Sequence, residues 1–514
     1  MRLRARVVVR LLIGASLISH AALPAAHSMQ ASPKSEQLAA VAAHEVARQD
    51  TATQGIVHVA YADAINQYFS RGVTPQNNAA VLLYQVMGPT PERCPLDDRF
   101  FELLGMPKPP ADGVYLTVPA DLTEAFDAAR QGPWRRRDHP EMADWLEQNA
   151  GLLETLHAAT KRTRYFSPLV VPEKATGAAG KPGLFSVLLP GIQQMRTLAR
   201  VLIARANLKV GSGDRQPAID DLLAAYRLGR LVGQGPTLVE GLVGIAIENM
   251  TAAAIPACLS APGLTQDDLS RLTTGLDQLP DRADIADKIE HGERYLLLDF
   301  AQTMAQGETP DFVGEVQAAS LLRVFRFRSL DWDWIAQDIN GWYDRLAAAM
   351  RLEEYEQRQT ALRQIEQQFQ QLQAEVEAAD SSVFIASLKL LASGRQEASQ
   401  RVSRVLLQMG LPAIAGVSRA RDRAEQHFRN LHAAIALVRY RLDHADRYPD
   451  VLVQLVPDYL TELPLDLFAA RPVQYRRDGQ GFVLYSVGPN ELDEEGRAES
   501  AKGEEADVVV RLPR

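Results

Sequence analysis

Acidic side chains are concentrated near the C-terminal end of the sequence, directly after an apolar run. Residues 482–497 read FVLYSVGPNELDEEGR, so the apolar run enters a Gly-Pro-Asn turn and then a string of carboxylates. Between residues 487 and 507, eight acidic residues stand against two basic ones, Arg497 and Lys502. Calcium binds about six to eight oxygen ligands, which this segment could supply together with backbone carbonyls. The alternative interpretation is a solvated acidic excursion between two strands.

The spacing of the first acids is similar to the start of an EF-hand loop. Glu491, Asp493 and Glu495 alternate along the chain ahead of Gly496, as the first ligands of that loop do. Lys502, however, stands where an EF-hand has its bidentate glutamate, which excludes an EF-hand proper. The segment is therefore either an irregular cation loop or a solvated turn.

A second group of carboxylates lies among tryptophans. Residues 330–346 read LDWDWIAQDINGWYDRL and hold three tryptophans and four aspartates. Two carboxylates with tryptophan platforms would suit glycoside hydrolysis, which uses a pair of acids around the scissile bond. The alternative is the start of a helix, with Asp333 near the N-cap and the tryptophans packed between helices. We prefer the helix start, because no second, separated acidic motif accompanies these residues.

An acid also interrupts the apolar segment TLVEGLVGIAIENM, residues 237–250. Thr237 and Glu240 fit the capping box, in which each side chain bonds a free backbone N–H at the helix start. A buried catalytic role for Glu240 is the alternative. The sequence has no GxSxG, HExxH, GxGxxG or CxxC motif, and its two cysteines, Cys94 and Cys258, lie far apart. We therefore expect no zinc site, leave the pairing of the cysteines open, and favour a protein without catalytic activity.

The first residues have the order of a secretory signal peptide. Arginines at positions 2, 4, 6 and 10 precede an apolar run over residues 11–18, which ends in small residues and Pro24. We expect cleavage of residues 1–28 and export to the periplasm or cell envelope of a bacterium. An uncleaved anchor and an organelle transit peptide are the alternatives. After cleavage we expect no transmembrane span, because Glu240 and Glu248 interrupt the other long apolar segment.

The charge of the chain bears on its partners. The formal net charge is −9, and loss of residues 1–28 with their four arginines lowers it to −13. Binding to a nucleic-acid backbone needs a basic surplus, which this chain lacks, so we expect no nucleic-acid partner. Hydrophobic residues make up 46% and charged residues 23% of the sequence, which is typical of globular proteins.

Residues 29–420 are predicted to be α-helical, in irregular bundles and hairpins. Apolar residues recur there at spacings of three and four, and glycine and proline cluster at the breaks. Residues 192–210 and 216–232 predict an αα-hairpin around the turn GSGDR. A long helix is predicted over residues 342–379, paired with residues 381–405 as an antiparallel hairpin. Its apolar seam has heptad spacing and consists of Leu362, Ile365, Phe369, Leu372 and Val376.

The C-terminal region, residues 421–514, predicts a small α+β domain. Its helix ends before Tyr448-Pro449, because the residue before a proline avoids the α region. Strands are predicted over residues 473–476 and 481–486, joined by an Asp-Gly hairpin turn. The valine run within residues 506–513 predicts a third strand.

This region resembles the globular domain of the major pseudopilins of type II secretion, a family related to type IV pilins. The residues that carry the resemblance agree in order and spacing: Tyr440, Leu442, Arg447-Tyr448-Pro449, Leu455-Val456-Pro457, Tyr459-Leu460, Pro464, Asp466, Gln474-Tyr475 and Tyr485-Ser486-Val487-Gly488-Pro489. Leu467 and Ala470 replace the Pro and Gly usual in the family's Asp-Pro-Phe/Trp-x-Gly loop, and Glu491 replaces a turn glycine. The family's prepilin N-terminus is absent, so we expect a pseudopilin-like domain fused to a helical body rather than a polymerising pilin.

The resemblance implies a calcium ion in the loop after the Tyr485-Ser486 strand, which corresponds to residues 487–507. We expect the ligands among four oxygen-bearing side chains, Asn490, Asp493, Glu494 and Asp507. Elsewhere, residues 192–250 and 330–346 are similar to parts of large, uncharacterised exported proteins of planctomycete-type bacteria. That similarity brings no known activity with it.

These observations predict an exported, non-enzymatic scaffold or interaction protein with protein partners, linked to secretion or envelope organisation. The alternative is an exported hydrolase with a carboxylate site around Asp331–Asp344. A deep pocket with convergent carboxylates there would favour the hydrolase, whereas filled apolar positions for Trp332 and Trp334 would favour the scaffold.

Overall fold

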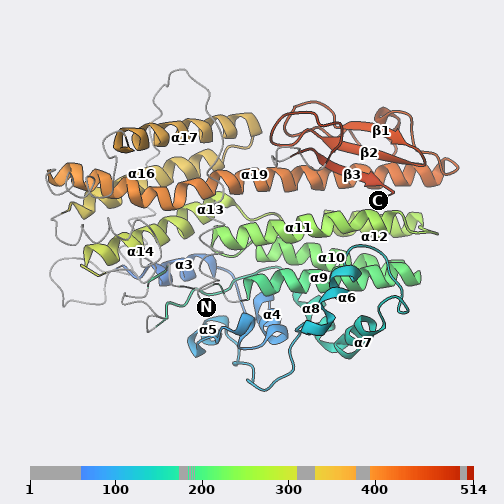
Figure 1. Cartoon of the computed structure of the whole chain (residues 1–514), viewed down its shortest axis with the longest axis horizontal. Coiled ribbons are helices and arrows are strands. Elements are labelled where there is room, and N and C mark those ends of the chain that lie inside the picture. The colour runs from blue at the N-terminus through green and yellow to red at the C-terminus, as the bar shows by residue number, and fades with distance from the viewer. Residues whose placement is uncertain are drawn as a thin grey trace.

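The computed structural model describes residues 59–172, 183, 184, 187, 189, 191–308, 330–377, 394–497 and 506–513. The expected signal peptide and three acids of the C-terminal loop, Glu499, Glu504 and Glu505, lie outside these residues. The described chain is mostly helical, with a small three-stranded antiparallel sheet near its C-terminal end (Figure 1). This confirms the predicted class, mainly α with a small α+β part.

The predicted αα-hairpin lies in the middle of the molecule. Helix α9 (Ile192–Ser212) and helix α10 (Arg215–Val232) are joined by a turn at Gly213 and Asp214, which is shorter than predicted because both helices extend into it. Gly213 has a φ of +89°, a left-handed conformation that commonly ends helices and favours glycine. One apolar stripe of α10 is buried and consists of Ile219, Leu222, Leu223, Tyr226 and Leu231.

Helix α11 (Leu238–Leu259) packs against α9 and α10 and is followed by helix α12 (Gln266–Asp277). The predicted capping box is confirmed. The Thr237 hydroxyl accepts a hydrogen bond from the Glu240 N–H (3.2 Å), and the Glu240 carboxylate accepts one from the Thr237 N–H (3.1 Å). In the described part of the chain, α11 is the one helix long and apolar enough to cross a membrane, and 72% of its most apolar stretch is buried inside the protein.

Shorter helices lie beneath α9 in the view of Figure 1. They are α4 (Ala79–Met87), α5 (Asp98–Leu104), α6 (Thr123–Ala129), α7 (Pro140–Gln148) and α8 (Ala150–Thr160). Two of them begin at side-chain caps, since Asn78 accepts a hydrogen bond from the Ala80 N–H and Asp97 accepts one from the Arg99 N–H. Their apolar side chains join those of α9, α10 and α11 in one large core.

A second apolar core lies beside the first. Helix α3 (Tyr61–Phe69) packs next to it against α14. Helix α13 (Ile285–Lys288) leads through a π-helical turn (Ile289–Glu293) into helix α14 (Arg294–Ala305). Helix α16 (Trp332–Met350) and helix α17 (Tyr355–Glu377) also contribute to this core. The described part of the predicted seam, Leu362, Ile365 and Phe369, is buried in it.

The predicted single helix over residues 342–379 is wrong. The helix is interrupted at residues 351–354, between α16 and α17, although these positions hold no proline or glycine. The break is stabilised by Arg358, whose guanidinium donates hydrogen bonds to the carbonyls of Leu352 (2.8 Å) and Glu353 (3.1 Å). In a continuous helix these carbonyls would accept hydrogen bonds from backbone N–H groups one turn later. Here the Arg358 side chain of the next helix supplies the donors instead.

Helix α19 (Arg395–Asp443) runs along the long axis of the molecule (Figure 1). It packs against α16 and α17 toward its start and carries the sheet toward its end. The sheet has the order β1 (Gln474–Asp478), β2 (Gly481–Ser486), β3 (Val508–Leu512), with both pairs antiparallel. All three predicted strands are therefore present, and the helix ends before Tyr448-Pro449 as predicted.

The predicted border between residues 420 and 421 falls inside α19. Apolar residues of the sheet, such as Phe482 and Val510, belong to the same core as α9, α10 and α11. The change in composition at this point is thus not accompanied by a break in the helix or in the packing.

Candidate functional site

The predicted acidic loop follows β2, and its start is fixed by Asp466. The Asp466 carboxylate is buried and accepts hydrogen bonds from the Ser486 hydroxyl (2.8 Å) and the Val487 N–H (3.0 Å). It also accepts one from the Phe468 N–H (2.9 Å), within its own turn. One buried carboxylate therefore ties the loop after residue 466 to the end of β2.

Three non-glycine residues of these loops, Ala470, Glu491 and Glu495 (φ +60°), have a backbone conformation that favours glycine. Ala470 has a φ of +49° and Glu491 a φ of +57°, both in the left-handed region. These are the two positions at which the pseudopilin pattern has glycine and this chain does not. The conformation usual for glycine is present at both positions although the residue type differs.

Three of the four predicted cation ligands lie together between the loop and β3. Asp507 is fully buried and accepts hydrogen bonds from the N–H groups of Gly496 (2.6 Å) and Glu494 (3.4 Å). Glu494 Oε1 accepts a hydrogen bond from the Asn490 side-chain amide (2.7 Å). Glu494 Oε2 is buried and has no hydrogen-bond partner among the described residues. Burial and the neighbouring Glu494 carboxyl raise the pKa of Asp507 to about 6.

The fourth predicted ligand, Asp493, has other partners. It is exposed and accepts hydrogen bonds from the Tyr485 hydroxyl (3.2 Å) and the Glu495 N–H (2.9 Å). Within the described residues, no three His, Cys, Asp or Glu side chains are gathered as a metal site. The candidate site in this part of the chain therefore consists of two carboxylates and one side-chain amide.

The chemistry of this site follows from the two carboxylates, Glu494 and Asp507. Adjacent carboxylates that are withdrawn from water cannot both stay charged at low cost, so a proton or a cation must compensate one of them. Carboxylate and amide oxygens are the ligands that hard cations such as calcium and magnesium prefer. Backbone carbonyls and water would have to complete the coordination sphere of such an ion.

Three polar residues of α19 hold this region against the helix, and sequence reasoning missed them. Arg423 donates a hydrogen bond to the carbonyl of Asp507 (3.3 Å), and Asn430 donates one to the carbonyl of Val508 (2.7 Å). Gln426 donates to the Asn430 side chain (2.8 Å). Their spacing of three and four residues places them on one face of the helix, and this spacing could have indicated them in the sequence.

The tryptophan- and aspartate-rich residues 330–346 form the first part of α16. Asp331 is the N-cap, and its carboxylate accepts a hydrogen bond from the Trp334 N–H (3.1 Å). Asp333, predicted near the N-cap, lies in the first turn two residues further on and is exposed. Trp332 and Trp334 are partly buried against the second core, so they pack on the protein rather than line an open platform.

The remaining aspartates of this segment point to separate partners. Asp338 accepts a hydrogen bond from the Ser403 hydroxyl on α19 (2.7 Å), and Asp344 pairs with Arg294 on α14 (2.6 Å). The third tryptophan, Trp342, is buried. The carboxylates of residues 330–346 therefore serve as a cap and as contacts between helices, and they do not converge on one point.

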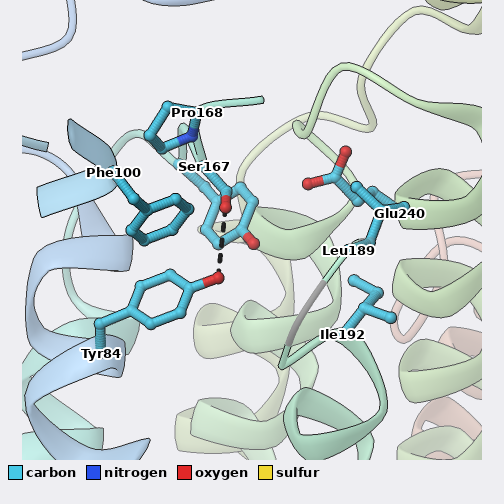
Figure 2. A pocket seen from close by; sticks show the side chains of 8 residues that line it. Tyr84, Phe100, Ser167, Pro168, Leu189, Ile192 and Glu240 are labelled. Carbon is cyan, nitrogen blue, oxygen red and sulfur yellow. Dashed lines mark hydrogen bonds between the residues drawn. The ribbon is translucent and has the colours of Figure 1, made fainter. Parts of the chain in front are cut away.

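Glu240 lies at the edge of a small pocket (Figure 2). The other polar groups of this pocket are the hydroxyls of Tyr84, Tyr165 and Ser167, and those of Tyr84 and Ser167 are hydrogen-bonded to each other (3.2 Å). Apolar side chains such as Phe100 and Ile192 close the remaining sides. The enclosed space holds about one water molecule, which is too little for an organic substrate.

The environment of Glu240 also explains its burial without catalysis. Burial raises the pKa of Glu240 to about 7, against the opposing charge of Lys288. Lys288 is itself buried and donates a hydrogen bond to the carbonyl of Gly235, and burial lowers its pKa to about 8. Glu293 accepts a hydrogen bond from the Leu238 N–H (2.9 Å) at the same helix start. Glu240 and Glu293 thus accept hydrogen bonds from the backbone N–H groups of Thr237 and Leu238, which have no partner within the helix.

The two cysteines, whose pairing the sequence left open, are not bonded to each other: Cys258 is buried, which raises its thiol pKa to about 12, and Cys94 is half-buried. Comparisons with protein-family models, with curated proteins and with solved structures give no match to this chain.

Proposed function

We propose that this chain is an exported, non-enzymatic protein of the bacterial cell envelope. Its helical body serves as a scaffold for protein partners, and its C-terminal region is a pseudopilin-like domain that binds a divalent cation, with calcium as the expected ion. The signal-like N-terminal residues support export, and the secretion-related role rests on the resemblance of the C-terminal region.

The observation that carries the cation proposal is the pair Glu494 and Asp507. Asp507 is fully buried, and Glu494 Oε2 is buried without a partner in the described part of the chain. A calcium ion beside these oxygens would compensate their charge and supply the missing partner. Asn490 holds the Glu494 carboxylate in place, since its amide donates to Glu494 Oε1 (2.7 Å) while its own oxygen accepts a hydrogen bond from the Leu492 N–H (3.1 Å).

Two observations support the pseudopilin-like backbone. The left-handed conformations of Ala470 and Glu491 fall at the family's glycine positions. The buried Asp466 joins its own loop to the end of β2, which gives a structural reason for an aspartate at that position. The scaffold role of the body is supported by the separate structural partners of the aspartates in residues 330–346.

Calcium binding is tested on the full chain by isothermal titration calorimetry and by thermal unfolding in calcium against EGTA. A ligand at 100 times its Kd adds about 2.7 kcal/mol to the free energy of unfolding, so we expect a higher midpoint in calcium. Glu494→Gln should abolish this response. Glu462→Gln is the matched control, because Glu462 is an exposed acid of the same region. An equal midpoint in calcium and in EGTA would exclude the cation.

Export is tested independently of the cation. Cell fractionation should place the protein outside the cytoplasm, and sequencing of the mature N-terminus should identify cleavage near residue 28. Recovery of the intact chain from the cytoplasm would contradict export and leave the calcium result unaffected.

A further inference from the structure

A cluster of three arginines lies where α6 packs against α9. Arg196 and Arg200 are one turn apart on α9, so their side chains are neighbours on one face of the helix. Arg130 follows the last residue of α6, which contacts α9 directly. We call these residues the arginine cluster.

In the described part of the chain, Asp127 is the acidic residue that pairs with the arginine cluster. Asp127 pairs with Arg130 (2.9 Å), and it is the acidic group whose charge acts on Arg200. Arg196 donates to the neutral amide oxygen of Gln193 (3.1 Å). Among the described residues, these three arginines thus form one ion pair, with Asp127, so the cluster carries a local excess of positive charge in a chain whose net charge is −9.

The guanidinium groups are also incompletely bonded. The Nε atoms of Arg196 and Arg200 are buried and have no hydrogen-bond partner among the described residues. Burial, together with the charges of Arg196 and Arg130, lowers the pKa of Arg200. All three side chains remain partly exposed, so a ligand from solvent can reach them.

We propose that the arginine cluster binds a phosphate group. A phosphate carries close to two negative charges and several acceptor oxygens, which match the charge excess and the free donors of the cluster. Arginine forks bind such tetrahedral anions with paired hydrogen bonds. The phosphate comes either from a soluble phosphate compound or from the headgroup of an anionic lipid. The cluster lies on α6 and α9, away from Glu494 and Asp507, and its assignment does not depend on the proposed function.

The test uses the full chain and three probes. Calorimetry with inorganic phosphate and with pyrophosphate, at constant ionic strength, measures binding of a soluble anion. Flotation with equimolar phosphatidylglycerol and phosphatidylcholine vesicles, against phosphatidylcholine alone, measures binding to a headgroup. We expect at least one probe to bind, and Arg200→Gln and Arg196→Gln each to weaken that binding about tenfold or more, since each removes a charged hydrogen bond.

The matched control is Arg271→Gln. This substitution also removes one positive charge from the protein. Phosphate binding should be unchanged, because Arg271 is already paired with Asp220 through two hydrogen bonds (2.9 and 2.8 Å). Without phosphate, Arg200→Gln should unfold at the wild-type temperature or above it, because repulsion within the cluster is relieved. The proposal fails if no probe binds, if Arg200→Gln and Arg196→Gln bind as wild type, or if Arg200→Gln lowers the unfolding temperature without phosphate, which would make Arg200 a structural residue.

Discussion

Arg423 of α19 donates a hydrogen bond to the carbonyl of Asp507, the buried acid of the candidate cation site, at 3.3 Å. It also donates to the carbonyl of Ala506 (2.5 Å), so one guanidinium fixes the backbone that enters β3. The position of the site is thereby set by a helix more than sixty residues earlier in the chain.

Removal of this support should weaken both the fold and the site. We expect Arg423→Ala to lower the free energy of unfolding by about 1.5–3 kcal/mol, the usual range for hydrogen bonds from a charged group. Calcium affinity should fall as well, because Asp507 is no longer held in place. Chemical denaturation and calorimetry measure the two effects. Arg419→Ala, at an exposed position of the same helix, is the control and should change neither.

Asp507 should make calcium binding depend on pH. Its pKa of about 6 lies above the value of about 3.9 in an unfolded chain, so the folded protein holds an extra proton between these values. Without a cation, stability should therefore fall as the pH rises from about 4 to about 6. Calcium competes with this proton, so its Kd should decrease over the same range. Calorimetry at several pH values checks this, and a pH-independent Kd would remove Asp507 from the ligand set.

A buried aspartate also joins three helices of the body. Asp221 of α10 is fully buried and pairs with His157 of α8 (2.5 Å) and with Arg205 (2.6 Å) and Lys209 (2.6 Å) of α9. We expect Asp221→Asn to cost about 3–5 kcal/mol of unfolding free energy, because the cations keep their burial and lose their partner. Asp220→Asn removes only an exposed pair with Arg271 and should cost about 1 kcal/mol or less.

Asp221 should also determine how the free energy of unfolding changes as the pH falls. Burial opposes ionisation of Asp221, but the hydrogen bonds from His157 and Arg205 outweigh it and lower its pKa. An acid with a lowered folded pKa stabilises the fold above its unfolded pKa, and this contribution is lost as the pH falls through the folded value. Asp221→Asn should therefore reduce the slope of stability against pH below about pH 4. A slope equal to that of the wild type would contradict the pairing.

The close approach of α10 and α11 should not tolerate a side chain. A Cβ on Gly244 would lie 2.6 Å from the carbonyl oxygen of Gly229, so Gly244→Ala should destabilise the protein by about 1–3 kcal/mol. Gly341 on α16 is exposed and has no atom within 4 Å of the added carbon. Gly341→Ala should stabilise by up to about 1 kcal/mol, because alanine favours the helix. Equal effects of the two substitutions in thermal unfolding would contradict the packing.

Replacement of Glu491 by glycine should stabilise the protein. Its φ of +57° disfavours residues with a Cβ, so Glu491→Gly should raise the free energy of unfolding by about 0.5–1 kcal/mol. The same substitution at Glu462, which has no left-handed backbone, should lower it by about 0.5–1 kcal/mol through greater chain entropy in the unfolded state. Opposite signs in the two variants are the expected result, and a loss at both positions would contradict the assigned conformation.

Local sequence signals predicted the elements that depend on local interactions. The hairpin of α9 and α10, the capping box at Thr237 and the three strands need only periodicity, a cap and a turn, and all are present. The sequence did not predict the interruption between α16 and α17, because it depends on the position of the Arg358 side chain. That side chain is held by an ion pair with Asp422 of α19 (2.7 Å), a residue distant in the sequence. No residue within the break carries that information.

The candidate site shows the same division. Asn490, Glu494 and Asp507 could be named from composition and resemblance, since oxygen-bearing residues after the strand are visible in the sequence. The position of Asp493 apart from the other three residues depends on which way each side chain points, because Asp493 bonds Tyr485 instead. The contribution of Arg423 depends on how α19 lies against β3, a contact between distant parts of the chain.

Helix α19 has a mechanical consequence. Its 49 residues correspond to a rod of about 74 Å at the usual rise per residue. One end is clamped among α16 and α17, and the other carries the sheet. A partner that pulls on the sheet would therefore load α19, and the force would pass along the helix to the elements packed against it, which include α11 and α12 in the first core and α16 and α17 in the second.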